Sequence, residues 1–165
     1  WVHRFYRYPG FRTQLAPTSG AMGYGVPSAV GAAIVHRQRR VVSFSGDGDF
    51  LMNGQELATA MQYDARVIFI VVNNGMYGTI RMHQERHYPA RISGTMLKNP
   101  DFAALARAYG LHGEIVVATR DFEAAFDRAW NAKTAALIEV RIAPDAISPR
   151  ASLSSLREEA LKNKS

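Results

Sequence analysis

Six consecutive apolar residues, Val67 to Val72, constrain the fold of this chain more than any other segment. All six belong to the β-branched or aromatic residue types that favour strands. An uninterrupted apolar run of this length is typical of a parallel strand that is covered on both faces. A shorter apolar segment, residues 41–45, precedes it, and residues 55–63 between the two have helical periodicity. We therefore predict a βαβ unit with a right-handed crossover.

The rest of the chain alternates in the same way. Helices are expected over residues 26–38, 101–109 and 121–132, and the helix at 55–63 is expected to have Asn53 as its N-cap. Further strands are expected over 114–117 and 136–142, whereas the first 19 residues read as irregular. The pattern predicts a three-layer, doubly wound α/β fold, with a mainly parallel sheet and helices on both faces. Ligands are expected beyond the carboxyl ends of its strands.

The length of 165 residues suits one domain with a real core. We assign residues 1–148 to this domain and residues 149–165 to a polar C-terminal tail, whose leucines could dock one short helix. The chain begins with Trp1 and not with Met, so we expect it to be excised from a larger multidomain enzyme.

Composition narrows the function classes. The chain has no cysteine, which excludes disulfides and thiolate zinc sites and fits a cytoplasmic location. No apolar run approaches the roughly 20 residues that span a bilayer, so no membrane partner is expected. The net charge of +6 would suit nucleic acid, but no nucleic-acid motif accompanies it. We therefore expect no nucleic-acid partner, and attribute the charge to a solvated surface that also attracts small anions.

Polar residues follow the two neighbouring apolar segments at the points where the predicted strands end. The first segment runs into Gly46-Asp47-Gly48-Asp49, and the second into Asn73-Asn74-Gly75. Carboxylate and amide oxygens suit Mg²⁺, which keeps few protein ligands and shares phosphate oxygens. Glycines allow the backbone to approach an anion closely. The pair of motifs predicts a site for a metal-bridged diphosphate, with Asp47 and Asn74 facing the metal.

Three other interpretations fit the residues less well. Either strand-end motif alone could be an ordinary turn or helix cap. The segment that begins at Gly23 nearly matches a dinucleotide fingerprint, but no strand precedes it and the third glycine is missing. His83 and His87 are spaced like a zinc pair on one helical face, yet no acidic partner falls at the usual spacing. We expect these histidines to line a pocket or face solvent.

The string GDGDFLMNGQELATAMQYDARVIFIVVNNGMYGTIR, with TSGAMGYGVPSAVGAA ahead of it, resembles the C-terminal thiamine diphosphate-binding domain of acetolactate synthases, benzoylformate decarboxylases and related 2-oxo-acid enzymes. The resemblance implies thiamine diphosphate and Mg²⁺ as cofactors. It implies three metal ligands, namely the side chains of Asp47 and Asn74 and the backbone carbonyl of Met76. The cofactor-binding residues that it implies are Gly20, Met22, Gly46, Asp47, Gly48, Asp49, Asn74, Met76, Tyr77 and Gly78.

The resemblance also assigns some of these residues roles. The Gly20 carbonyl is expected to face the aminopyrimidine, and Met22 to be the wedge beneath the bent cofactor. Gly48 and Asp49 are expected to offer backbone N–H groups to the diphosphate. Ile80 and His83 are expected to border the substrate pocket. Acetolactate synthases typically carry a tryptophan where this chain has His83, and this departure weakens the specific assignment to acetolactate synthesis.

The implied reaction is decarboxylation of a 2-oxo acid, after which the enamine is protonated or joined to a second carbonyl. No catalytic residue is expected in this chain, because the activating glutamate of the family lies on a pyrimidine-binding domain of a neighbouring subunit. The resemblance therefore implies a homodimer or homotetramer, and an isolated domain that is inactive. The alternative is a non-catalytic module that binds a diphosphate or nucleotide.

Overall fold

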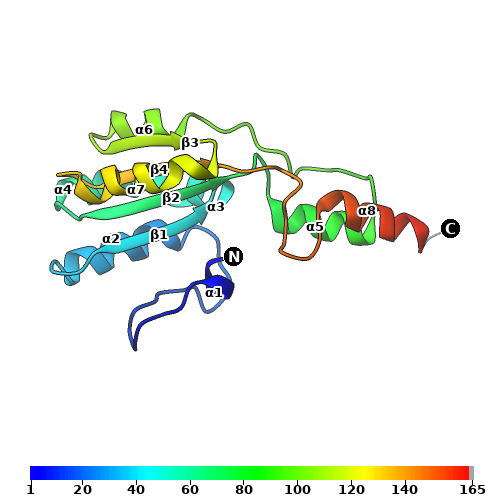
Figure 1. Ribbon diagram of the computed structural model, residues 1–165, viewed down its shortest axis with the longest axis horizontal. Helices are drawn as coiled ribbons and strands as arrows, with labels where there is room; N and C mark the ends of the chain where they lie inside the picture. Colours follow the sequence, from blue (N-terminus) through cyan, green and yellow to red (C-terminus); the bar gives the residue numbers. More distant parts are fainter. Residues whose placement is uncertain (164–165) are drawn as a thin grey trace.

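A four-stranded parallel sheet forms the centre of the molecule (Figure 1). The computed structural model describes residues 1–163. The strands are β1 (Val41–Gly46), β2 (Val67–Asn73), β3 (His112–Val116) and β4 (Ala136–Arg141), in the spatial order β1-β2-β4-β3. All three strand pairs are parallel. All carboxyl ends of the strands therefore meet at one edge, and the predicted parallel α/β fold is confirmed.

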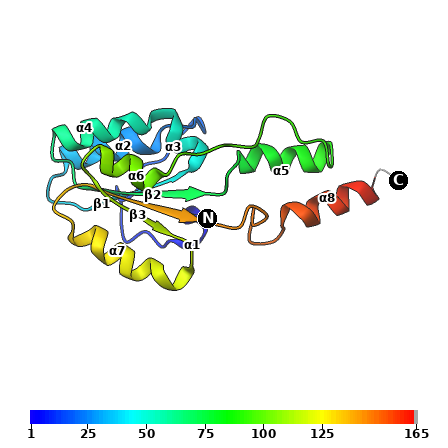
Figure 2. The same cartoon turned by 90° about the horizontal axis from the view of Figure 1, so that it is seen from above.

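Helices cover both faces of the sheet (Figure 2). On one face lie α2 (Gly25–Val35), α4 (Leu57–Gln62) and α6 (Phe102–Ala108), and on the other lies α7 (Phe122–Asn131). Alternate residues of β2 enter the two cores: Phe69 packs with residues of α2, α4 and α6, whereas Ile70 packs with residues of α7. Because side chains alternate between the faces of a strand, a strand covered on both sides is apolar throughout. This explains the apolar run at residues 67–72.

The helix after β1 begins earlier than predicted. α3 (Asp47–Asn53) follows β1 directly, and a short 3₁₀ turn, η1 (Gly54–Glu56), joins it to α4. The extended backbone of Gly46 places it at the N-cap of α3. Asn53 occupies the N-cap position of η1, which leads into α4, as predicted for this helical segment. Its side chain makes no capping hydrogen bond, however, and donates to the Gly23 carbonyl instead.

Other helix starts agree better with the sequence pattern. The carboxylate of Asp101 caps α6 by accepting a 2.7 Å hydrogen bond from the Ala104 backbone N–H. Asp121 ends a short 3₁₀ turn, η2 (Thr119–Asp121), and occupies the N-cap position of α7, but makes no capping hydrogen bond with its side chain. One short helix, α1 (Val2–Phe5), lies in the N-terminal segment that reads as irregular.

Two helices form an arm beyond the carboxyl edge of the sheet. α5 (Gly78–His87) leaves the turn after β2, and α8 (Leu153–Lys162) packs against it (Figures 1 and 2). A reciprocal pair of hydrogen bonds between Ser152 and Ser155 caps the start of α8. The helix at α5 was not expected from the sequence. Among residues 1–163, no helix combines the length and hydropathy that a membrane span requires.

Candidate cofactor-binding site

Asp47 is the buried carboxylate at the carboxyl edge of the sheet, with 2% of its surface exposed. Its Oδ1 accepts a 3.0 Å hydrogen bond from the backbone N–H of Gly48. Its Oδ2 accepts two more, from the backbone N–H of Gly75 at 2.8 Å and from Asn99 Nδ2 at 2.7 Å. The ends of β1 and β2 therefore meet at one carboxylate, as the strand-end motifs predict. The Gly48 N–H, which we expected to face a diphosphate, donates to Asp47 in this structure.

The turn after β2 is fixed from both sides. The Oδ1 of Asn74 accepts a 3.1 Å hydrogen bond from the Met76 backbone N–H, so this amide oxygen faces its own turn. On the other side, the Tyr77 N–H donates to the Thr95 carbonyl and the Leu97 N–H donates to the Gly75 carbonyl, both at 2.9 Å. Met76 is buried with 6% of its surface exposed. These contacts hold Asn74 and the Met76 backbone beside the Gly75–Asp47 contact.

Two glycines of the site are required by close packing. A Cβ on Gly48 would overlap the ring of Tyr77, which lies against the first turn of α3. A Cβ on Gly78 would lie 2.8 Å from Asn74 Nδ2 and 2.8 Å from Ile147 Cδ1. The predicted residues Gly48, Asn74, Tyr77 and Gly78 therefore lie together in one packed group.

The loop before α2 is held against α3. The Gly23 N–H donates to Asp49 Oδ1 at 2.6 Å, and the Gly23 carbonyl accepts from Asn53 Nδ2 at 2.8 Å. Gly23 has a φ of +86°, a conformation that side chains rarely adopt. This clamp fixes the end of the segment that carries Gly20 and Met22, both of which are exposed. The side chain of Asp49 thus has a structural contact that the sequence did not indicate.

A second buried carboxylate supports the site from β4. Glu139 is fully buried, and its Oε1 accepts hydrogen bonds from Asn73 Nδ2 at 2.9 Å and Arg141 Nε at 2.7 Å. Its Oε2 accepts from the Phe102 N–H at 3.1 Å. The contact with Glu139 raises the pKa of the Arg141 guanidinium. Sequence reasoning missed Glu139, although an acidic residue inside the apolar segment 136–140 was an available signal.

The predicted substrate-pocket residues lie on α5. Ile80 is half exposed, and the exposed ring of His83 stacks on His87 with ring centroids 6.4 Å apart. Within the described residues, no group of three or more histidine or acidic side chains could hold a metal. The structure thus places these two residues on the arm and not in the packed group around Asp47.

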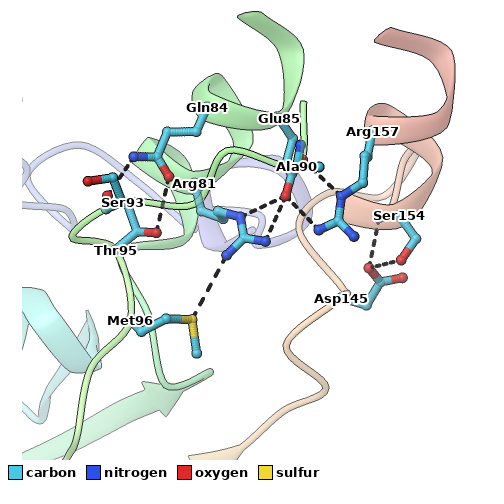
Figure 3. Close-up of polar contacts among 10 residues, drawn as sticks. All are labelled: Arg81, Gln84, Glu85, Ala90, Ser93, Thr95, Met96, Asp145, Ser154 and Arg157. Carbon is cyan, nitrogen blue, oxygen red and sulfur yellow. Dashed lines mark hydrogen bonds and ion pairs between the residues drawn. The ribbon is translucent and has the colours of Figure 1, made fainter. Parts of the chain in front are cut away.

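The buried Glu85 ties α5 to α8 (Figure 3). Its Oε1 accepts from Arg81 Nη2 and from Arg157 Nη2, each at 2.6 Å, and its Oε2 accepts from the Ala90 N–H at 2.9 Å. The hydrogen bond from Arg157 is the largest cause that lowers the pKa of Glu85 to about 2, and the bonds from Ala90 and Arg81 add to it. The helix that follows the turn at residues 74–77 is therefore anchored by a charged contact.

The donor set around Asp47 fits Mg²⁺. An ionised carboxylate offers about four lone-pair positions, and three of those on Asp47 are already used. One position remains on Oδ1, and Asn74 and the backbone of the turn supply further oxygen atoms nearby. Mg²⁺ is usually bound by one or two carboxylates together with phosphate oxygens and water. A single buried carboxylate with neutral oxygen donors therefore suits Mg²⁺ better than it suits Zn²⁺, which favours nitrogen and sulfur ligands.

The family model described as "Thiamine pyrophosphate enzyme, C-terminal TPP binding domain" matches residues 1–140. The fold and the site thus define a cofactor domain of the α/β type, and the chain belongs to the family of thiamine pyrophosphate enzymes. The resemblance and the predicted thiamine diphosphate cofactor are therefore confirmed at the level of the family.

Curated relatives are similar to this chain over part of their length. The chain is 36% identical over 147 residues to an acetolactate synthase of Arthrospira platensis. The aligned region covers 88% of the chain and 25% of that protein. It is 39% identical over 124 residues to the acetolactate synthase isozyme 2 large subunit of Escherichia coli, covering 74% of the chain and 23% of that subunit. The chain spans about a quarter of the length of these relatives.

Solved structures agree with the fold. A thiamine diphosphate-dependent 4-hydroxybenzoylformate decarboxylase of Rhodococcus jostii is 37% identical, with a TM-score of 0.72, over 77% of the chain and 24% of that protein. A benzoylformate decarboxylase of Polynucleobacter necessarius is 30% identical, with a TM-score of 0.73, over 79% of the chain and 25% of that protein. The chain is thus similar to both branches that the sequence motifs resemble.

Proposed function

We propose that this chain is the cofactor domain of a thiamine diphosphate- and Mg²⁺-dependent enzyme that acts on a 2-oxo acid, as an acetolactate synthase-like carboligase or a decarboxylase. The observation that carries the proposal is the contact between Asp47 Oδ2 and the Gly75 N–H, which joins the two halves of the motif at one buried carboxylate. Asp47, Asn74 and the Met76 carbonyl would hold Mg²⁺. When bound, thiamine diphosphate supplies an electron sink for the carbanion left by decarboxylation.

The residues of this chain orient the cofactor and do not react. The turn at residues 74–77 is fixed by hydrogen bonds to residues 95 and 97, so its oxygen atoms are pre-organised. The clamp on Gly23 fixes the segment carrying Met22, whose exposed side chain is free to support a bound cofactor. Such pre-positioning lowers the entropic cost of reaching the reactive geometry.

The partner would be a pyrimidine-binding domain of a neighbouring subunit, which contributes the activating glutamate, in a homodimer or homotetramer. Two observations support this arrangement. The cofactor segment around Gly20 and Met22 is exposed, and the curated relatives are about four times as long as the matched region. The named activities of the relatives support a 2-oxo acid as the substrate, with His83 and Ile80 at the border of its pocket.

Calorimetry on the full-length protein tests the metal assignment. The Asp47→Asn variant keeps the side-chain shape but removes the charge, so we expect Mg²⁺-dependent binding of thiamine diphosphate to fall at least tenfold. Asp127→Asn, on the exposed face of α7, is the matched control and is expected to bind like the wild type. Equal affinity in Asp47→Asn and wild type would refute the role of Asp47.

Product analysis separates the enzyme from a binding module. Wild-type protein with pyruvate, benzoylformate or glyoxylate is expected to release carbon dioxide and an aldehyde or hydroxy-ketone. Tight cofactor binding without carbon dioxide release from any 2-oxo acid would favour the non-catalytic alternative.

A further inference from the structure

We propose that Asn99 is a positioning residue that sets the orientation of the Asp47 carboxylate; this inference rests on the proposed role of Asp47 as a metal ligand. Asn99 lies in the segment that leads into α6, 52 positions after Asp47. Its Nδ2 donates to Asp47 Oδ2 at 2.7 Å and to Asn73 Oδ1 at 2.9 Å. One amide group thus joins the end residue of β2 to the carboxylate that follows β1.

The chemistry of its neighbours fixes the orientation of this amide. Both partners of Nδ2 are acceptors, because Asp47 offers a carboxylate oxygen and Asn73 Oδ1 also accepts from the Gly75 N–H at 3.0 Å. A flipped amide would place oxygen against two oxygens. In the part of the chain that the structure describes, the Oδ1 of Asn99 is buried and has no hydrogen-bond partner. A buried acceptor without a partner costs free energy. The amide keeps this orientation because its two donated hydrogen bonds offset that cost.

The hydrogen bonds continue from Asn99 into the core. Asn73 receives the Asn99 bond on Oδ1 and donates from Nδ2 to the fully buried Glu139. Glu139 is itself held by the Phe102 N–H at the start of α6. The Asp47 carboxylate is therefore connected, through the amides of Asn99 and Asn73, to the Glu139 carboxylate in the centre of the sheet. Each amide in this series of hydrogen bonds is restrained by two neighbours. Supporting residues orient metal ligands through hydrogen bonds of this kind.

The position of Asn99 determines which lone pair of Asp47 is available. Asn99 and Gly75 together use both lone pairs of Oδ2, and Gly48 uses one of Oδ1. The remaining lone pair is on Oδ1, so a cation would be bound through that single oxygen. Without Asn99, Oδ2 regains a free lone pair and the carboxylate can rotate. Loss of such a supporting contact typically lowers metal affinity about 10- to 100-fold.

The test compares Asn99→Leu with wild type in the full-length protein. Leucine has nearly the shape of asparagine and no donor. We expect calorimetric Mg²⁺ affinity, measured with saturating thiamine diphosphate, to fall at least tenfold. Turnover is expected to recover at high Mg²⁺ while KM for the 2-oxo acid changes less than twofold, because the pocket residues are untouched. Asn131→Leu, on exposed α7, is the matched control.

The outcomes separate positioning from folding. Asn99→Ala is measured alongside, because a smaller side chain avoids overpacking if the leucine variant unfolds. Mg²⁺ affinity equal to wild type in a folded variant overturns the inference. The inference is also overturned if cofactor affinity falls and KM rises by the same factor and high Mg²⁺ restores neither. That is the result expected if Asn99 only supports the fold. If the wild-type protein fails to bind Mg²⁺ with thiamine diphosphate, the proposed function itself is overturned. Failure of the proposed function is thus distinguished from failure of the inference about Asn99.

Discussion

The side-chain amide of Asn53 donates a 2.8 Å hydrogen bond to the carbonyl oxygen of Gly23, 30 positions earlier in the chain. Together with the bond from the Gly23 N–H to Asp49, it holds both backbone polar groups of Gly23 against α3. The cofactor segment is thus fixed by the same helix that begins at Asp47. The loop around Gly23 and the carboxylate of Asp47 are therefore both held by α3.

Gly23→Ala is expected to loosen this support. The φ of +86° is unfavourable for alanine by about 1–2 kcal/mol, and the added Cβ would lie 2.7 Å from Asn53 Nδ2. We expect a loss of about 2 kcal/mol or more in the free energy of unfolding, measured by denaturant titration. Gly20→Ala is the matched control, because its φ of +68° carries the strain but nothing lies within 4 Å. Equal losses in both variants would show that the contact with Asn53 is unimportant.

Gly48→Ala is expected to displace Tyr77. The new Cβ would overlap the Tyr77 ring, so either the ring or α3 must shift, at about 1–3 kcal/mol of stability. Thiamine diphosphate affinity is expected to fall with it, as measured by calorimetry. Gly31→Ala, in α2 with open space around it, is expected to stabilise by up to about 1 kcal/mol. A Gly48→Ala/Tyr77→Ala double variant that is no better than the single one would contradict this explanation.

Acid is expected to weaken the α5–α8 arm. The pKa of Glu85 is lowered from 4.5 to about 2, so its stabilising contribution is present above pH 4.5 and is lost as the pH falls from 4.5 toward 2. The shift corresponds to a contribution on the order of 3 kcal/mol at neutral pH. Denaturant titrations at pH 7, 4 and 3 are expected to show this loss in wild type and a shallower pH dependence in Glu85→Gln. Parallel pH profiles for the two proteins would contradict the assignment.

The sheet and the position of Asp47 could be predicted because their signals are local. Residues 67–72 reveal a doubly covered strand on their own, and a motif that directly follows a strand must lie at its carboxyl end. Parallel pairing then brings residues 47 and 75 together, as Asp47 Oδ2 and the Gly75 N–H confirm. The individual ligand roles at the site stay predictions.

The supporting residues could not be predicted because their partners are distant in sequence. Asn99 lies 52 positions after Asp47, and only the folded chain places it against that carboxylate. α5 was missed because its helical face is polar: Arg81 and Glu85 are buried as an ion pair and not as an apolar stripe. Asn53 occupies the predicted N-cap position, but its contact with the distant Gly23 carbonyl could not be predicted, because the same side chain can serve as a cap or as a donor.

The contact between Glu85 and Arg157 has a consequence for the order of folding. It joins residues 72 positions apart, so closing it requires a long loop that the βαβ unit does not need. Contacts of high sequence separation form slowly, and we expect α8 to dock after the βαβ unit of β1 and β2 has assembled. A nascent chain would therefore bring Asp47 against the Gly75 turn before the last helix packs against α5, the helix that leads out of that turn.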